Sequence, residues 1–159
     1  IGYLFGQYRR IRGSYENGVL TGKGLSYGGS LIRPEATGFG ATYYAVEMFK
    51  HFGEEIKGKT FAISGFGNVA WGAAKKATEL GAKVVCISGP DGYILDEEGM
   101  NDDKIAYMLE LRSSNNGVVK PFADKFPSAT FIAGKKPWEA KVDIAMPCSL
   151  QNELNPLPA

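Results

Sequence analysis

The sequence is poor in cysteine and histidine and contains no long apolar run, and each of these scarcities excludes a class of protein. Cys86 and Cys148 are the only cysteines, and they form neither a disulfide framework nor a CxxC metal motif. No apolar run approaches the roughly 20 residues that span a bilayer. The first residues also lack the basic-then-apolar order of a signal peptide. We therefore expect a soluble cytoplasmic protein with two buried free thiols.

An excess of charge of one sign is also missing. The 18 lysines and arginines nearly balance the 17 aspartates and glutamates, for a net charge of +1. Such a chain has no overall field that would recruit nucleic acid or an anionic membrane. HExxH and GxSxG motifs are absent, and the single histidine, His51, falls near a predicted helix end, where it favours the negative terminus. We predict no nucleic-acid or membrane partner, no metal site and no catalytic residue in this chain.

What is present is the pattern of one α/β domain. The chain has 159 residues, 44% of them hydrophobic, which is enough for a core. Apolar residues at helical spacing predict a helix at the start and another over residues 37–52, with Thr37 as its N-cap. From residue 57, strand-like runs alternate with helical patterns, which is typical of a parallel sheet. The predicted strands are residues 60–64, 83–88, 129–133 and 142–146.

These elements predict a Rossmann-like fold, with a mostly parallel sheet and helices on both faces. We expect residues 1–56 to form a helical connecting segment and residues 57–159 to form the Rossmann core. Within the connecting segment, Gly28 and Gly29 are open to two interpretations, because a hinge and a tight packing turn both require glycine.

A glycine-rich turn follows the first predicted strand. Gly65, Gly67 and Ala70 form G-x-G-x-x-A between that strand and an alanine-faced helix, the setting that the dinucleotide fingerprint requires. Gly65 permits the turn, Gly67 leaves room for a pyrophosphate, and Ala70 allows close packing of the helix. The helix N-terminus attracts phosphate groups. We interpret the turn as a dinucleotide-binding loop, and a purely structural turn is the alternative.

The choice of cofactor depends on Asp91. It lies 26 residues after Gly65, where about 20 is usual for the carboxylate that binds the adenosine ribose. It also belongs to the turn-forming sequence PDG, and the sequence leaves both roles open. A carboxylate there would repel the 2′-phosphate of NADP, and no arginine is its neighbour in the sequence. We predict NAD, with NADP as the alternative, since the Ser88 hydroxyl could donate to a phosphate.

Four segments together resemble one family. They are GGSLIRPEATGFG (28–40), GKTFAISGFGNVAWGAAKKATELGAKV (58–84), SGPDGYI (88–94) and KPWEAKVDIAMPCSLQNEL (136–154). In this order they are similar to the cofactor domain of hexameric bacterial glutamate dehydrogenases. The related leucine, valine and phenylalanine dehydrogenases are the alternative within the same superfamily.

The resemblance implies the reversible oxidative deamination of L-glutamate to 2-oxoglutarate and ammonia by a homohexamer. It assigns Thr37 to the nicotinamide carboxamide, Asn68 and Val69 to the pyrophosphate and its ribose, and Arg33 to the substrate cleft. The candidate cofactor-binding residues are therefore Thr37, Gly65, Phe66, Gly67, Asn68, Val69 and Asp91.

The resemblance also implies that the catalytic residues lie in a substrate domain preceding this chain, and that a later segment completes the sheet. We therefore expect the chain alone to be inactive. Two readings from other classes remain: a regulatory module that binds a nucleotide without chemistry, and a structural α/β interaction domain with no nucleotide affinity.

Overall fold

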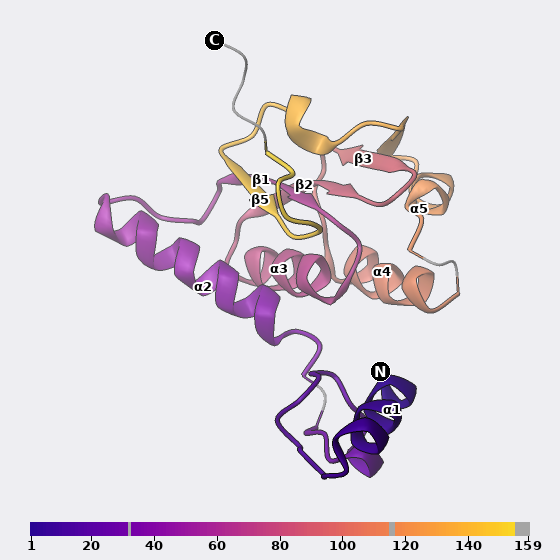
Figure 1. Ribbon diagram of the computed structural model, residues 1–159. Helices are drawn as coiled ribbons and strands as arrows, with labels where there is room; N and C mark the ends of the chain where they lie inside the picture. Colours follow the sequence, from indigo (N-terminus) through magenta and orange to yellow (C-terminus); the bar gives the residue numbers. More distant parts are fainter. Residues whose placement is uncertain (32, 115–116, 155–159) are drawn as a thin grey trace. The chain divides into compact units, whose positions relative to one another are not determined.

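The structure is a computed structural model that describes residues 1–31, 33–114 and 117–154 (Figure 1). The chain divides into two compact units, residues 1–33 and residues 34–159. No helix within the described residues is long and apolar enough to cross a membrane.

The first unit is built around a short helix and a loop that folds against it. Helix α1 (Gly2–Arg12) buries Phe5, and the 3-10 helix η1 (Leu25–Tyr27) follows the loop. Lys23 is buried, and its ammonium donates to the Val19 carbonyl at 2.6 Å and lies 5.5 Å from the centre of the Phe5 ring. A Cβ on Gly29 would lie 1.9 Å from the Lys23 carbonyl oxygen. The close approach favours the packing turn over the hinge at Gly28 and Gly29.

The second unit contains a five-stranded sheet in the order β4-β3-β2-β1-β5. The strands are β1 (Thr60–Ser64), β2 (Lys83–Ser88), β3 (Gly92–Asp96), β4 (Ala129–Ala133) and β5 (Ile144–Pro147). β1 pairs in parallel with β2 and β5, whereas β3 is antiparallel to both β2 and β4. Four strands thus run in one direction and β3 is reversed, which confirms the α/β fold with a mixed sheet.

Three of the predicted strands coincide with β1, β2 and β4, and the fourth begins two residues later than predicted, as β5. β3 was not predicted, because its apolar run of Tyr93, Ile94 and Leu95 is short and follows directly after the PDG turn. The turn is present, since Gly89 donates its amide to the Gly92 carbonyl at 2.8 Å. It is a hairpin turn, and the residues after it pair with β2.

The α-helices of this unit gather on one face of the sheet, where Figure 1 shows α2, α3 and α4 in a row. Helices α3 (Asn68–Glu79), α4 (Asp102–Ser114) and α5 (Lys120–Lys125) share one apolar core with the strands. The other face carries a smaller cluster covered by the 3-10 helix η2 (Pro137–Glu139) and the residues around it. The expectation of helices on both faces is therefore corrected: the short connection between β4 and β5 forms only a 3-10 turn.

Helix α2 (Ala36–His51) packs closely along α3. A Cβ on Gly38 would lie 2.3 Å from the Ala73 nitrogen, and one on Gly72 would lie 2.8 Å from the Glu35 carbonyl oxygen. Glycine at both positions lets the two backbones approach. Because α2 packs on α3, it belongs with the sheet, and the compact units divide after residue 33 where the sequence suggested residue 56. Glu35 is the N-cap of α2, so Thr37 lies within the first turn.

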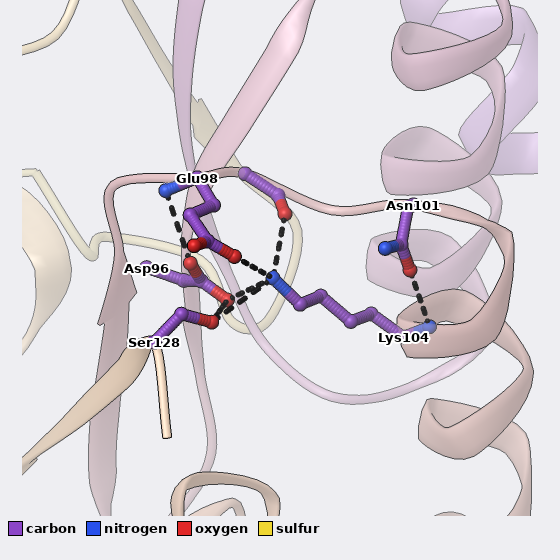
Figure 2. A network of polar contacts seen from close by, with 6 residues as sticks. Asp96, Glu98, Asn101, Lys104 and Ser128 are labelled. Carbon is purple, nitrogen blue, oxygen red and sulfur yellow. Dashed lines mark hydrogen bonds and ion pairs between the residues drawn. The ribbon is translucent and has the colours of Figure 1, made fainter. Parts of the chain in front are cut away.

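A buried ionic network holds the reversed strand in place (Figure 2). The Lys104 ammonium on α4 lies 2.7 Å from an Asp96 carboxylate oxygen at the end of β3 and donates to Ser128, just before β4, at 3.1 Å. Ser128 in turn donates to Asp96 at 3.1 Å. The side chains of Lys104 and Asp96 are 5% and 0% exposed. The network ties the end of β3 to α4 and β4.

Candidate functional site

The carboxyl ends of three parallel strands, β1, β2 and β5, meet at one edge of the sheet. After β1 the chain forms α3 and then β2 on one side, whereas β5 pairs on the other side of β1. Ligands of open α/β sheets bind at the carboxyl edge where the strand order reverses in this way. The candidate site therefore lies above β1, between the loops that follow β2 and β5.

The two glycines of the turn after β1 are explained by different physical reasons. Gly65 has φ +94°, and a Cβ there would lie 2.9 Å from the Cys148 carbonyl oxygen. Gly67 has φ −87°, and its Cβ would meet no atom within 4 Å. Backbone conformation and packing therefore explain Gly65 but not Gly67. An exposed glycine that the chain itself does not require fits a group that must approach this backbone, as a pyrophosphate does.

The N-terminus of α3 offers what a phosphate needs. Gly67 is the N-cap of this 12-residue helix and makes no side-chain capping hydrogen bond. Asn68 is exposed and Val69 is half-buried, so the first turn is open to solvent. Unpaired amides and the positive end of the helix dipole attract anions there. Ala70 is fully buried, in agreement with its expected packing role.

Two other predicted residues lie at the same turn. Thr37 is exposed in the first turn of α2 and precedes Gly38, whose Cβ would lie 2.4 Å from the Val69 carbonyl oxygen. The close packing of α2 on α3 thus brings Thr37 next to the first turn of α3. The Phe66 side chain is buried in the core, so only its backbone faces the turn.

The structure shows Asp91 in a third role that the sequence did not indicate. Its carboxylate accepts hydrogen bonds from the amides of Val119, at 2.9 and 3.2 Å, and Lys120, at 3.0 Å. Asp91 therefore holds the start of α5, and its oxygens retain lone pairs for a further donor. Ser88 is fully buried and accepts from the Gly65 amide at 3.0 Å. The idea that Ser88 donates to a cofactor phosphate is therefore wrong, because its hydroxyl lies inside the sheet.

Arg112 is a residue of this site that the sequence did not indicate. Its guanidinium, on α4, donates to the side-chain oxygen of Asn68. Partial burial lowers the pKa of Arg112, and the group stays charged at neutral pH. The prediction of NAD used the lack of an arginine beside Asp91 in the sequence, but the fold brings one to the glycine turn. No local pattern could have revealed it, since the pairing joins positions 44 residues apart.

Arg33 and His51 are the remaining residues that the sequence singled out. Arg33 is exposed at the end of the first unit, and its place beside the nicotinamide stays a prediction. His51 is exposed at the last position of α2. Among the described residues, no group of three or more His, Cys, Asp or Glu side chains is arranged to hold a metal ion.

Both cysteines are free, Cys86 being buried and Cys148 half-buried, so the expectation of two buried thiols holds for Cys86 alone. Burial raises the pKa of Cys86 to about 12. Burial, followed by the charge of Glu153, raises the pKa of Cys148 to about 11. Neither thiol is therefore an activated nucleophile at neutral pH.

Comparison with known proteins places these features in one family. A family model described as Glutamate/Leucine/Phenylalanine/Valine dehydrogenase matches residues 28–158. An NAD-specific glutamate dehydrogenase of Bacteroides fragilis is 64% identical over 155 residues, which are 98% of this chain and 35% of that protein. An NADP-specific glutamate dehydrogenase of Giardia intestinalis is 48% identical over 158 residues, again 98% and 35%. A solved glutamate dehydrogenase structure aligns with a TM-score of 0.82 at 59% identity, covering 97% of this chain and 34% of that one.

Proposed function

The chain belongs to the Glutamate/Leucine/Phenylalanine/Valine dehydrogenase family, and from this premise we propose that it is the dinucleotide-binding part of an NAD-dependent glutamate dehydrogenase. It spans about a third of the length of the curated relatives that it matches. The remainder of such an enzyme would supply the catalytic residues and bind glutamate. The names of those relatives support glutamate as the substrate over leucine, phenylalanine or valine.

The proposal rests on one observation: neither the backbone conformation nor the packing at position 67 requires a glycine. Its side-chain direction is open, its φ is accessible to any residue, and it is the N-cap of α3. We assign the pyrophosphate to this turn, where the amides of Asn68 and Val69 would donate to it. Thr37 would bind the nicotinamide carboxamide, and Arg33 would face the substrate.

The experiment is a titration with NADH of the longer protein that contains this chain. Gly67→Ala adds a methyl group where the pyrophosphate would lie, so we expect the Kd of NADH to rise at least tenfold, a loss of about 1.4 kcal/mol in binding free energy. The thermal stability should not change. Gly40→Ala is the matched control, since its Cβ would also meet open space, within α2. Quenching of Trp71, which lies in the first turns of α3, reports binding. Undiminished binding by Gly67→Ala would reject the assignment.

The same titration with NADPH tests the choice of cofactor. Asp91 would accept a hydrogen bond from the adenosine ribose and repel a 2′-phosphate. Arg112 works in the other direction, because its positive charge lies at the glycine turn. We propose that the carboxylate dominates and that NADH binds more tightly than NADPH. Equal affinities would mean that Asp91 serves only to hold the start of α5.

The reaction follows from placing glutamate against this cofactor. A bound nicotinamide would supply the hydride acceptor for the substrate, and closure of a substrate domain onto the sheet edge would align the two and exclude water. The backbone at the turn and the Asp91 carboxylate would hold the dinucleotide. We further propose that the protein is cytoplasmic and that it forms a homohexamer, and light scattering on the purified protein would test the oligomeric state.

A further inference from the structure

The loop directly after β5 has its backbone amides held by two side chains. The Cys148 amide donates to the Ser64 hydroxyl oxygen at 3.1 Å. The amides of Ser149 and Leu150 both donate to one carboxylate oxygen of Glu153, at 3.0 and 2.5 Å. Ser64 is the last residue of β1, so the loop after β5 is attached both to its own continuation and to the neighbouring strand.

The group that holds this loop is a partly buried carboxylate. The second oxygen of Glu153 is buried and has no hydrogen-bond partner among the described residues. Burial acts to raise the pKa of Glu153, but the Ser64 hydroxyl and the two backbone amides outweigh it and leave the pKa below its usual value. A carboxylate that accepts several donors stays ionised at neutral pH.

The loop lies against the first glycine of the cofactor turn. A Cβ on Gly65 would lie 2.9 Å from the Cys148 carbonyl oxygen and 3.0 Å from the Ser149 Cβ. Asp91, proposed for the adenosine ribose, follows β2 on the other side of β1. A dinucleotide whose pyrophosphate lies at Gly67 extends across the edge. Its nicotinamide half must therefore pass over the β5 side, where residues 148–150 form the surface.

We propose that Glu153 is a positioning residue for the nicotinamide half of the cofactor. Its carboxylate holds the Ser149 and Leu150 amides and so keeps the loop after β5 in the shape that the nicotinamide riboside meets. Glu153 itself does not touch the ligand, because its free oxygen is buried. The inference rests on the proposed function, since it presupposes a dinucleotide at this edge.

The test compares two ligands that differ only in the half that the loop would meet. NADH carries both halves, whereas ADP carries the adenosine and the pyrophosphate without the nicotinamide riboside. Calorimetric titrations of the longer protein that contains this chain would use Glu153→Ala, Glu153→Gln and the control Gln151→Ala, an exposed neighbour. Gln retains an oxygen that accepts from both amides, so it is the conservative rescue.

We expect Glu153→Ala to raise the Kd of NADH about tenfold, because hydrogen bonds to a charged group are lost, and to leave the Kd of ADP within about twofold. Glu153→Gln and Gln151→Ala should behave like the wild type. Equal weakening of both ligands by Glu153→Ala, or an unchanged Kd for NADH, would overturn the proposal. Failure of the wild type to bind NADH would instead reject the proposed function itself.

Discussion

At the scale of the residue, chemistry at the sheet edge is governed by which polar groups remain available after folding. Ser88 is committed to the Gly65 amide and Ser64 to the Cys148 amide. Asp91 already accepts from two amides. The groups that remain available to a ligand are the backbone amides at the start of α3. Gly67 leaves them accessible because it has no side chain. The described groups at this edge are therefore suited to binding and orienting an anion.

The Cys148 thiol allows a prediction about pH. Its pKa is raised to about 11, first by burial and then by the charge of Glu153. Only roughly one thiol in a thousand is thus ionised at pH 8, and the thiolate is the form that reacts with iodoacetamide. We expect alkylation of Cys148 in the folded protein to be about a hundredfold slower than in guanidinium chloride, and to accelerate steadily between pH 8 and pH 10.

Mass spectrometry of the two cysteine-containing peptides measures this rate, and Cys86 is the internal control. With a pKa raised to about 12 by burial, Cys86 should react more slowly still. Rapid labelling of Cys148 at pH 8 would show a thiolate stabilised by its surroundings, contrary to the structure.

At the scale of the element, β3 runs opposite to the other four strands of the sheet, and a buried ion pair secures it. Its end carries Asp96, which is fully buried and paired with Lys104 of α4, and Ser128 bridges the pair to β4 (Figure 2). A carboxylate in this position is stable only while its partners are present. The network therefore links the placement of three elements.

Removal of the cation should be strongly destabilising. Lys104→Met preserves most of the side-chain volume but leaves the Asp96 carboxylate buried without an ion-pair partner, so we expect a loss of about 3 kcal/mol in the free energy of unfolding. The control is Lys50→Met, which removes an exposed pair with Glu47 on α2 and should change stability by less than about 0.5 kcal/mol.

Urea unfolding followed by circular dichroism compares the two variants. Similar stabilities for Lys104→Met and Lys50→Met would show that the buried network does not hold β3. A loss confined to Lys104→Met supports the link between strand reversal and the ionic network.

Several elements were predictable because their signals are local. β1, β2 and β4 were predicted with the bounds that the structure gives, since apolar runs bounded by turn residues are typical of strands. The end of α3 also has a local signal, because Gly81 adopts a left-handed conformation after the last turn. β3 was missed because five residues after a strong turn signal carry little periodicity. The N-cap of α2 was misplaced by two residues, at Thr37, because Glu35 makes no side-chain cap that a pattern could indicate.

At the scale of the whole molecule, we predict that the chain carries the cofactor turn and that the catalytic residues of the proposed enzyme lie elsewhere. We expect the 159-residue chain by itself to show no glutamate-dependent reduction of NAD, although it carries the glycine turn. The measurement is the rise in absorbance at the NADH wavelength with glutamate present, with the longer protein as the positive control. Measurable turnover by the isolated chain would show that a catalytic group lies within it.

The α/β class, the glycine turn and the family resemblance could be predicted from the sequence, because apolar periodicity, turn chemistry and motif order are all properties of neighbouring residues. The three-dimensional fold was needed to reveal the reversal of β3, the burial of Ser88, the hydrogen bonds of Asp91 to the start of α5 and the approach of Arg112 to Asn68. The amide-holding role of Glu153 depends on the structure for the same reason. Each of these features depends on contacts between residues that packing brings together in three dimensions. The sequence alone does not show whether a polar side chain is hydrogen-bonded within the fold or remains available to a ligand.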